Sequence, residues 1–134
     1  MEHTQSKGRI LICDDERDIR DILGRLVRQE GYEALEAADG TAALAAIRQQ
    51  PPDLLFLDVR MPGLDGIEVL RQVKLLAPQL AVVIISSSAA TTDTAMARAC
   101  GACGYLLKPF RHEEVLRSLQ SAMTERQSQH NAGS

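Results

Sequence analysis

The chain of 134 residues alternates short, unbroken apolar runs with segments of helical periodicity. The runs cover residues 10–13, 54–57, 81–85 and 105–107, and a more polar candidate strand covers 32–37. An unbroken run of this length is typical of a strand that is buried on both faces, as in a parallel sheet. Because parallel neighbours need crossover helices, the alternation predicts an α/β domain with helices on both faces of one sheet.

Segments between and after the runs have the apolar spacing of amphipathic helices. They lie at residues 19–27, 43–47, 67–73, 92–100 and 115–123. Asp39 or Thr41 is placed to cap the second helix, and Pro78 to end the third. We therefore expect one domain, residues 1–134, with its core at about 8–126 and a polar, frayed tail at 127–134.

The composition argues against several classes of protein. A net charge of −3 and 3% aromatic residues do not favour a nucleic-acid surface. The chain has neither an apolar run long enough for a membrane span nor a signal-peptide pattern, so we expect a cytoplasmic protein. Three cysteines fit a reducing compartment. Cys100 and Cys103 form one C-x-x-C pair, but a zinc site needs further ligands, and we interpret both as small packing residues.

Polar side chains follow each apolar run that we expect at the centre of the sheet. Asp14 and Asp15 follow the first run, Asp58 follows the run at 54–57, serines beginning at Ser86 follow the next, and Lys108 follows the last. Taken singly, each is most often a turn or cap residue. Since parallel strands end at the same edge, however, these acids, hydroxyls and an amine are brought together where such sheets bind ligands.

The chemistry of this set indicates phosphoryl transfer. Clustered carboxylates repel one another unless a cation joins them, and Mg²⁺ suits carboxylates, waters and phosphate oxygens. An aspartate can attack phosphorus, and the dianionic product then needs a metal, an amine and a hydroxyl. We therefore predict that Asp14 and Asp15 hold the metal and that Asp58 is the nucleophile. Ser86 and Lys108 would bond the phosphate oxygens.

On these residues the chain resembles the receiver domain of two-component response regulators, over about residues 8–126. The motifs are ILICDDE, LLFLDVRMPGLDG, VVIISSSA and GACGYLLKPF. The resemblance implies a doubly wound, flavodoxin-like fold with a five-stranded parallel sheet in the order 2-1-3-4-5. It also implies a signalling phospho-acceptor rather than an enzyme, which receives its phosphoryl group from a sensor histidine kinase or a phosphotransfer protein.

The resemblance assigns a role to each acid of the site. Asp58 is the phosphorylated aspartate and also contacts Mg²⁺. Asp15 is a direct metal ligand, whereas Asp14 more often acts through water, and Arg60 contributes its backbone carbonyl. Arg60 and Ser88 occupy the variable positions that flank the site, and they are expected to tune the lifetime of the phosphoryl group.

The resemblance also assigns the residues that respond to phosphorylation. Lys108 pairs with the phosphate, and the Lys108–Pro109 bond is expected to be cis. Counting 22 residues back from Lys108, the spacing of the family, selects Ser86 as the switch hydroxyl. Tyr105 is the aromatic residue that turns inward when that hydroxyl moves.

The surface of the fourth helix, fifth strand and fifth helix is then expected to change and to signal to a downstream protein, to an output domain outside this chain, or to a second copy in a homodimer. Other readings stay open: a module from a hybrid histidine kinase or a larger regulator, or a pseudo-receiver used only for binding. A small Mg²⁺-dependent phosphatase would use Asp58 as well. It would normally want a second acid two residues later, where this chain has Arg60.

Overall fold

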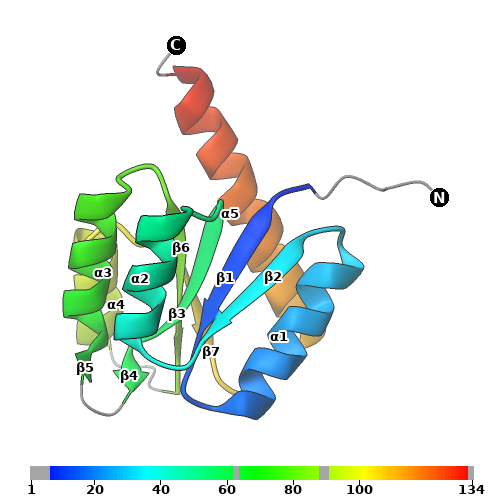
Figure 1. The fold of residues 1–134 in the computed structure, drawn as a ribbon, viewed down its shortest axis with the longest axis horizontal. Coiled ribbons are helices and arrows are strands. Elements are labelled where there is room, and N and C mark those ends of the chain that lie inside the picture. The colour runs from blue at the N-terminus through cyan, green and yellow to red at the C-terminus, as the bar shows by residue number, and fades with distance from the viewer. Residues whose placement is uncertain (1–6, 62–63, 88–90, 133–134) are drawn as a thin grey trace.

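A computed structural model describes residues 7–61, 64–87 and 91–132 of the chain (Figure 1). Five strands form one parallel sheet, β1 (Arg9–Cys13), β2 (Glu33–Ala37), β3 (Leu54–Asp58), β6 (Ala81–Ser86) and β7 (Gly104–Leu107). Their order across the sheet is β2-β1-β3-β6-β7. Numbered within this sheet alone, the order is 2-1-3-4-5, so the predicted doubly wound, flavodoxin-like fold is confirmed.

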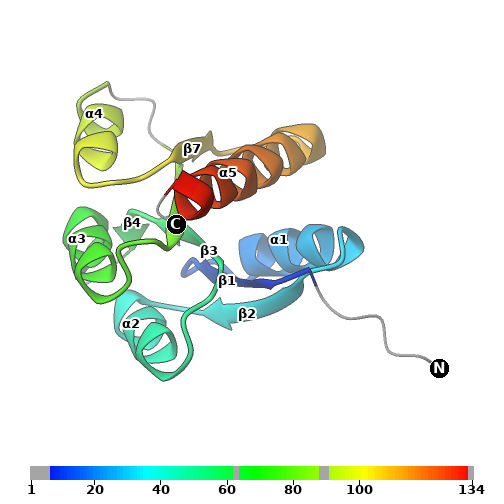
Figure 2. The same ribbon diagram turned by 90° about the horizontal axis from the view of Figure 1, so that it is seen from above.

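Helices cover both faces of the sheet, as the alternating pattern predicted (Figure 2). They are α1 (Arg17–Gln29), α2 (Gly40–Gln49), α3 (Gly66–Leu76), α4 (Thr91–Ala99) and α5 (His112–Ala132). Helices α1 and α5 lie on one face, and α2, α3 and α4 lie on the other. Asp39 is the N-cap of α2, because its Oδ1 accepts a hydrogen bond of 2.8 Å from the Ala42 amide.

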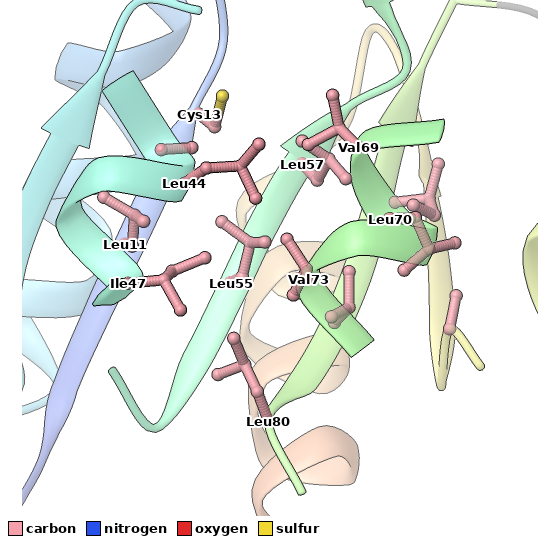
Figure 3. Close-up of a cluster of buried hydrophobic side chains, with 14 of the residues drawn as sticks. Leu11, Cys13, Leu44, Ile47, Leu55, Leu57, Val69, Leu70, Val73 and Leu80 are labelled. Atoms are coloured by element: carbon pink, nitrogen blue, oxygen red, sulfur yellow. The ribbon is translucent and has the colours of Figure 1, made fainter. Parts of the chain in front are cut away.

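The apolar core consists of two layers, one on each face of the sheet. Leu55 and Leu57 of β3 point between α2 and α3 (Figure 3), whereas Leu54 and Phe56 pack on the side of α1 and α5. All five residues of β3 are buried. Since neither face of β3 meets water, both sets of alternate side chains are apolar, which accounts for the unbroken run in the sequence.

The structure differs from the predicted element bounds in two places. A short antiparallel pair, β4 (Arg60–Met61) and β5 (Leu64–Asp65), follows β3 and was not predicted. Strands of two residues are too short to show a period of two. Helix α5 continues to Ala132, beyond the core end expected near 126, because no glycine or proline interrupts the chain before Gly133.

The C-x-x-C cysteines are both reduced and half-buried. Cys100 packs against the layer beneath α2, α3 and α4, and Cys103 packs against the layer beneath α1 and α5. They therefore contribute to different halves of the core. Among the described residues, no helix is long and apolar enough to cross a membrane.

Candidate functional site

The parallel register brings the ends of the central strands to one edge of the sheet. Asp58 pairs with Ile85, directly before Ser86, and Ser86 pairs with Leu107, directly before Lys108. Asp14, Asp58 and Ser86 are the polar or charged residues that the described part of the chain buries, each at most 2% exposed. Burying polar and charged groups costs free energy that packing alone does not return, and functional sites often carry such a cost. This edge of the sheet is therefore the candidate functional site.

Lys108 lies at the centre of the site. Its Nζ is 2.8 Å from Glu16 Oε1, 3.0 Å from Asp14 Oδ2 and 3.3 Å from Asp58 Oδ2. The backbone amide of Lys108 donates a hydrogen bond of 2.7 Å to the Ser86 carbonyl at the end of β6. The Lys108–Pro109 peptide bond is cis, as the resemblance implied.

Four carboxylates at this edge are arranged so that they could share one cation. One oxygen each of Asp14, Asp15, Glu16 and Asp58 lies within 4.8 Å of the others. Asp14 Oδ1 accepts a hydrogen bond of 2.8 Å from the Glu16 amide. Asp14 Oδ2 is buried and accepts no hydrogen bond within the described structure, although Lys108 lies at ion-pair distance. A buried, incompletely satisfied oxygen beside three further carboxylates fits a hard cation such as Mg²⁺.

The electrostatics of the site also favour an added cation. Burial raises the pKa of Asp14 to about 6, even though the hydrogen bond from the Glu16 amide and the nearby Lys108 ammonium act to lower it. Burial acts to lower the pKa of Lys108, but Glu16 and Asp14 outweigh it and the pKa is raised. One ammonium thus contacts three acids, and Asp15 adds a fourth negative charge to the same cluster. A divalent cation would relieve the remaining repulsion and favour the ionised form of Asp14.

Two residues support the acids in ways that we did not predict. Arg20 Nη1 donates a bond of 2.8 Å to the backbone carbonyl of Asp14, and Arg20 Nε donates one of 3.1 Å to Glu36 of β2. Arg20 therefore ties the backbone of the site to the neighbouring strand. Glu16 contacts Lys108 across 92 positions of sequence. The one local signal for Glu16 is that glutamate is not a preferred residue at the N-cap of a helix.

The structure places the remaining predicted site residues as follows. Asp15 is exposed and belongs to the acidic cluster. Arg60 begins β4, two residues beyond Asp58, and the role of its carbonyl as a metal ligand stays a prediction. Tyr105 is half-buried in β7 and packs against the layer beneath α2, α3 and α4, while its inward turn stays a prediction. Ser88 lies outside the described residues.

The loop after Asp58 is folded back tightly onto the start of α3. The Gly66 amide donates a bond of 3.3 Å to the Val59 carbonyl, and Asp65 caps α3 through a bond of 3.0 Å from the Ile67 amide. A Cβ atom at Gly66 would lie 2.6 Å from the Val59 carbonyl oxygen and would overlap the Val59 backbone. Glycine is thus required next to the segment that presents Asp58.

We expect Gly66→Ala to lower the free energy of unfolding by about 1–3 kcal/mol, because backbone rather than a flexible side chain must move. Gly24→Ala in α1 is the matched control. Its Cβ would meet the end of the Arg28 side chain at 3.3 Å, so we expect an unchanged or slightly higher stability. Urea unfolding of both variants measures the difference. Equal stabilities would show that the loop yields to the methyl group at little cost.

Comparisons with known proteins agree with this geometry. The family model described as "Response regulator receiver domain" matches residues 10–120. Sporulation initiation phosphotransferase F of Bacillus subtilis (strain 168) is 35% identical over 107 residues, which are 80% of this chain and 86% of that protein. Response regulator MprA of Mycobacterium avium (strain 104) is 37% identical over 115 residues, which are 86% of this chain but 50% of MprA.

Solved structures show the same fold. NtrX from Brucella abortus superposes with a TM-score of 0.89 and 34% identity, covering 94% of this chain and 29% of NtrX. A CheY-like response regulator receiver domain protein from Methanospirillum hungatei JF-1 superposes with a TM-score of 0.86 and 27% identity, covering 90% of this chain and 97% of that one. The chain thus spans nearly all of some relatives and half or less of others.

Proposed function

The chain belongs to the response regulator receiver domain family, and from this we propose that it accepts a phosphoryl group on Asp58 in a Mg²⁺-dependent reaction. The observation that carries the proposal is the placement of Asp58. It is 2% exposed, its Oδ2 is 3.3 Å from the Lys108 ammonium, and it shares the acidic cluster of the site. A carboxylate so placed can present one oxygen to an incoming phosphorus while cationic groups stabilise the charge that gathers there.

In the proposed reaction, one carboxylate oxygen of Asp58 forms a bond to the phosphorus of a phosphohistidine or of acetyl phosphate. The bond from phosphorus to the leaving nitrogen or oxygen breaks, and its electron pair stays with the imidazole or the acetate. Lys108 donates hydrogen bonds to the phosphoryl oxygens, and the Ser86 hydroxyl donates another. The product is an aspartyl phosphate at the end of β3, bound by Ser86 at the end of β6 and by Lys108 after β7.

The residues that would hold Mg²⁺ are Asp14, Asp15 and Asp58, with the backbone carbonyl of Arg60. The metal would supply positive charge that neutralises the phosphoryl oxygens. Arg20 keeps the backbone of Asp14 in place through its 2.8 Å bond. Because several oxygens of the cluster already lie within 4.8 Å of one another, the site is largely formed before the metal arrives.

Phosphorylation would then change which proteins the domain binds. The expected movement of Ser86 and Tyr105 lies at the ends of β6 and β7 and would alter the surface of α4, β7 and α5. Partners of this surface are a downstream protein, an output domain outside this chain, or a second copy. The phosphodonor is a sensor histidine kinase or a phosphotransfer protein. Arg60 and Ser88 would tune the lifetime of the phosphoryl group.

The proposal is tested by incubating the protein with acetyl phosphate and Mg²⁺. We expect one added phosphate by intact mass, lost on treatment with hydroxylamine, and located by peptide mapping on Asp58. The matched control replaces Mg²⁺ with a chelator and should show almost no uptake. Uptake that is independent of a divalent metal, or that maps to another residue, would contradict the proposal.

A further inference from the structure

Glu16 occupies a helix terminus without capping it. It is the N-cap residue of α1, yet its side chain makes no capping hydrogen bond. The side chain instead extends to Lys108 and accepts a hydrogen bond of 2.8 Å from Nζ. Residues that cap well have short side chains, whereas glutamate is long enough to reach across the site. The helix start therefore serves to place this carboxylate beside the lysine.

The three acids around Lys108 differ in accessibility and distance. Asp14 and Asp58 have buried side chains, whereas the Glu16 side chain is 59% exposed. Glu16 nevertheless makes the shortest of the three contacts, 2.8 Å against 3.0 and 3.3 Å. An exposed, flexible carboxylate can leave the lysine by rotating into solvent, which the buried acids cannot do.

Building on the proposed function, we propose that Glu16 is a positioning residue that holds Lys108 in the unphosphorylated protein and competes with the phosphoryl group for it. The ammonium has three donors and currently faces three carboxylates. A phosphoryl group on Asp58 adds oxygens that need the same donors. Lys108 must then exchange part of its bonding, and Glu16 is the partner most easily released. The strength of the Glu16 contact therefore sets how readily the phosphorylated state forms.

The test is the affinity for beryllofluoride, a mimic of the phosphoryl group that is not hydrolysed, at saturating Mg²⁺ and followed by ¹⁹F NMR. Glu16→Gln keeps the shape but removes the charge. Glu16→Asp keeps the charge but shortens the side chain by one methylene, so that it loses the contact. We expect both variants to bind beryllofluoride about three- to fivefold more tightly than the wild type, as for a partly exposed ion pair.

Asp18→Asn is the matched control, since it removes an exposed negative charge two residues away and should leave the affinity unchanged. Unchanged or weaker binding by both Glu16 variants would overturn the inference. Tighter binding by Glu16→Gln with wild-type binding by Glu16→Asp would also overturn it, because the general negative field and not the contact would then be responsible. A wild-type protein that binds no beryllofluoride would instead reject the proposed function itself.

Discussion

Replacing Asp58 with asparagine is expected to abolish phosphate uptake from acetyl phosphate in the presence of Mg²⁺. The amide has the shape of the carboxylate, but its oxygen carries no full negative charge and is a poor nucleophile toward phosphorus. Removal of a covalent nucleophile leaves no alternative route at this site, so we expect uptake to fall by at least roughly a hundredfold. Intact mass spectrometry at several time points measures the remaining rate.

The variant should stay folded, which makes the loss interpretable. Asp58 is 2% exposed, and the carbonyl oxygen of asparagine can still accept a bond from Lys108 at about the position of Asp58 Oδ2. Circular dichroism would establish that the fold is intact. Asp18→Asn, an exposed acid on α1, is the control and should take up phosphate at the wild-type rate. Equal uptake by the wild type and Asp58→Asn would show that another residue is modified.

Much of the fold is visible in the sequence because burial is continuous along the central strands. Every residue of β3 is buried, and four of its five side chains are apolar, so the pattern is unambiguous. The β4–β5 pair has no such signal. It forms because glycine at position 66 allows the backbone to approach Val59 closely enough for the Gly66 amide to donate a hydrogen bond to the Val59 carbonyl. The spacing of apolar residues does not predict this contact. Topological rules then bring the strand ends together at one edge.

The residues of the site that lie at the ends of strands could be predicted from the sequence, whereas the contacts that other residues make with them could not. Asp14, Asp58 and Lys108 each lie at the end of a strand of the sheet, and in the structure Lys108 contacts both acids. The Glu16–Lys108 pair joins positions 92 residues apart, and an exposed glutamate after two aspartates has no distinctive pattern. The hydrogen bond from Arg20 to the Asp14 carbonyl depends on where α1 places the long arginine side chain. Such contacts follow from the packed structure, which local spacing does not describe.

Asp14→Asn is expected to stabilise the metal-free protein while removing its affinity for Mg²⁺. Burial raises the pKa of Asp14 from 3.8 to about 6. Because the pKa of Asp14 is raised in the folded state, the protonated carboxyl favours folding. This contribution of Asp14 to the stability is fully present below pH 3.8 and is lost as the pH rises through about 6. Above that range the ionised carboxylate costs the folded state up to about 3 kcal/mol. Since the amide must also be buried, we expect a net gain of about 1–3 kcal/mol.

Thermal unfolding in chelator measures this gain as a rise of about 3–10 °C in Tm near pH 7.5. Near pH 4 the difference should shrink, because the wild-type carboxyl is then protonated in the folded state. Asp15→Asn is the matched control, since Asp15 is an exposed member of the same acidic cluster. It should weaken Mg²⁺ binding with little change in metal-free stability.

Added Mg²⁺ should reverse the order of stability. The wild type gains free energy in proportion to the logarithm of the metal concentration above its Kd, whereas Asp14→Asn and Asp15→Asn gain little. The Asp14 carboxylate thus lowers the stability of the metal-free protein and in return binds the metal. Its Oδ2 lacks a hydrogen bond within the described structure. If Asp14→Asn were no more stable than Asp15→Asn without metal, the 3.0 Å contact with Lys108 would already compensate the buried charge.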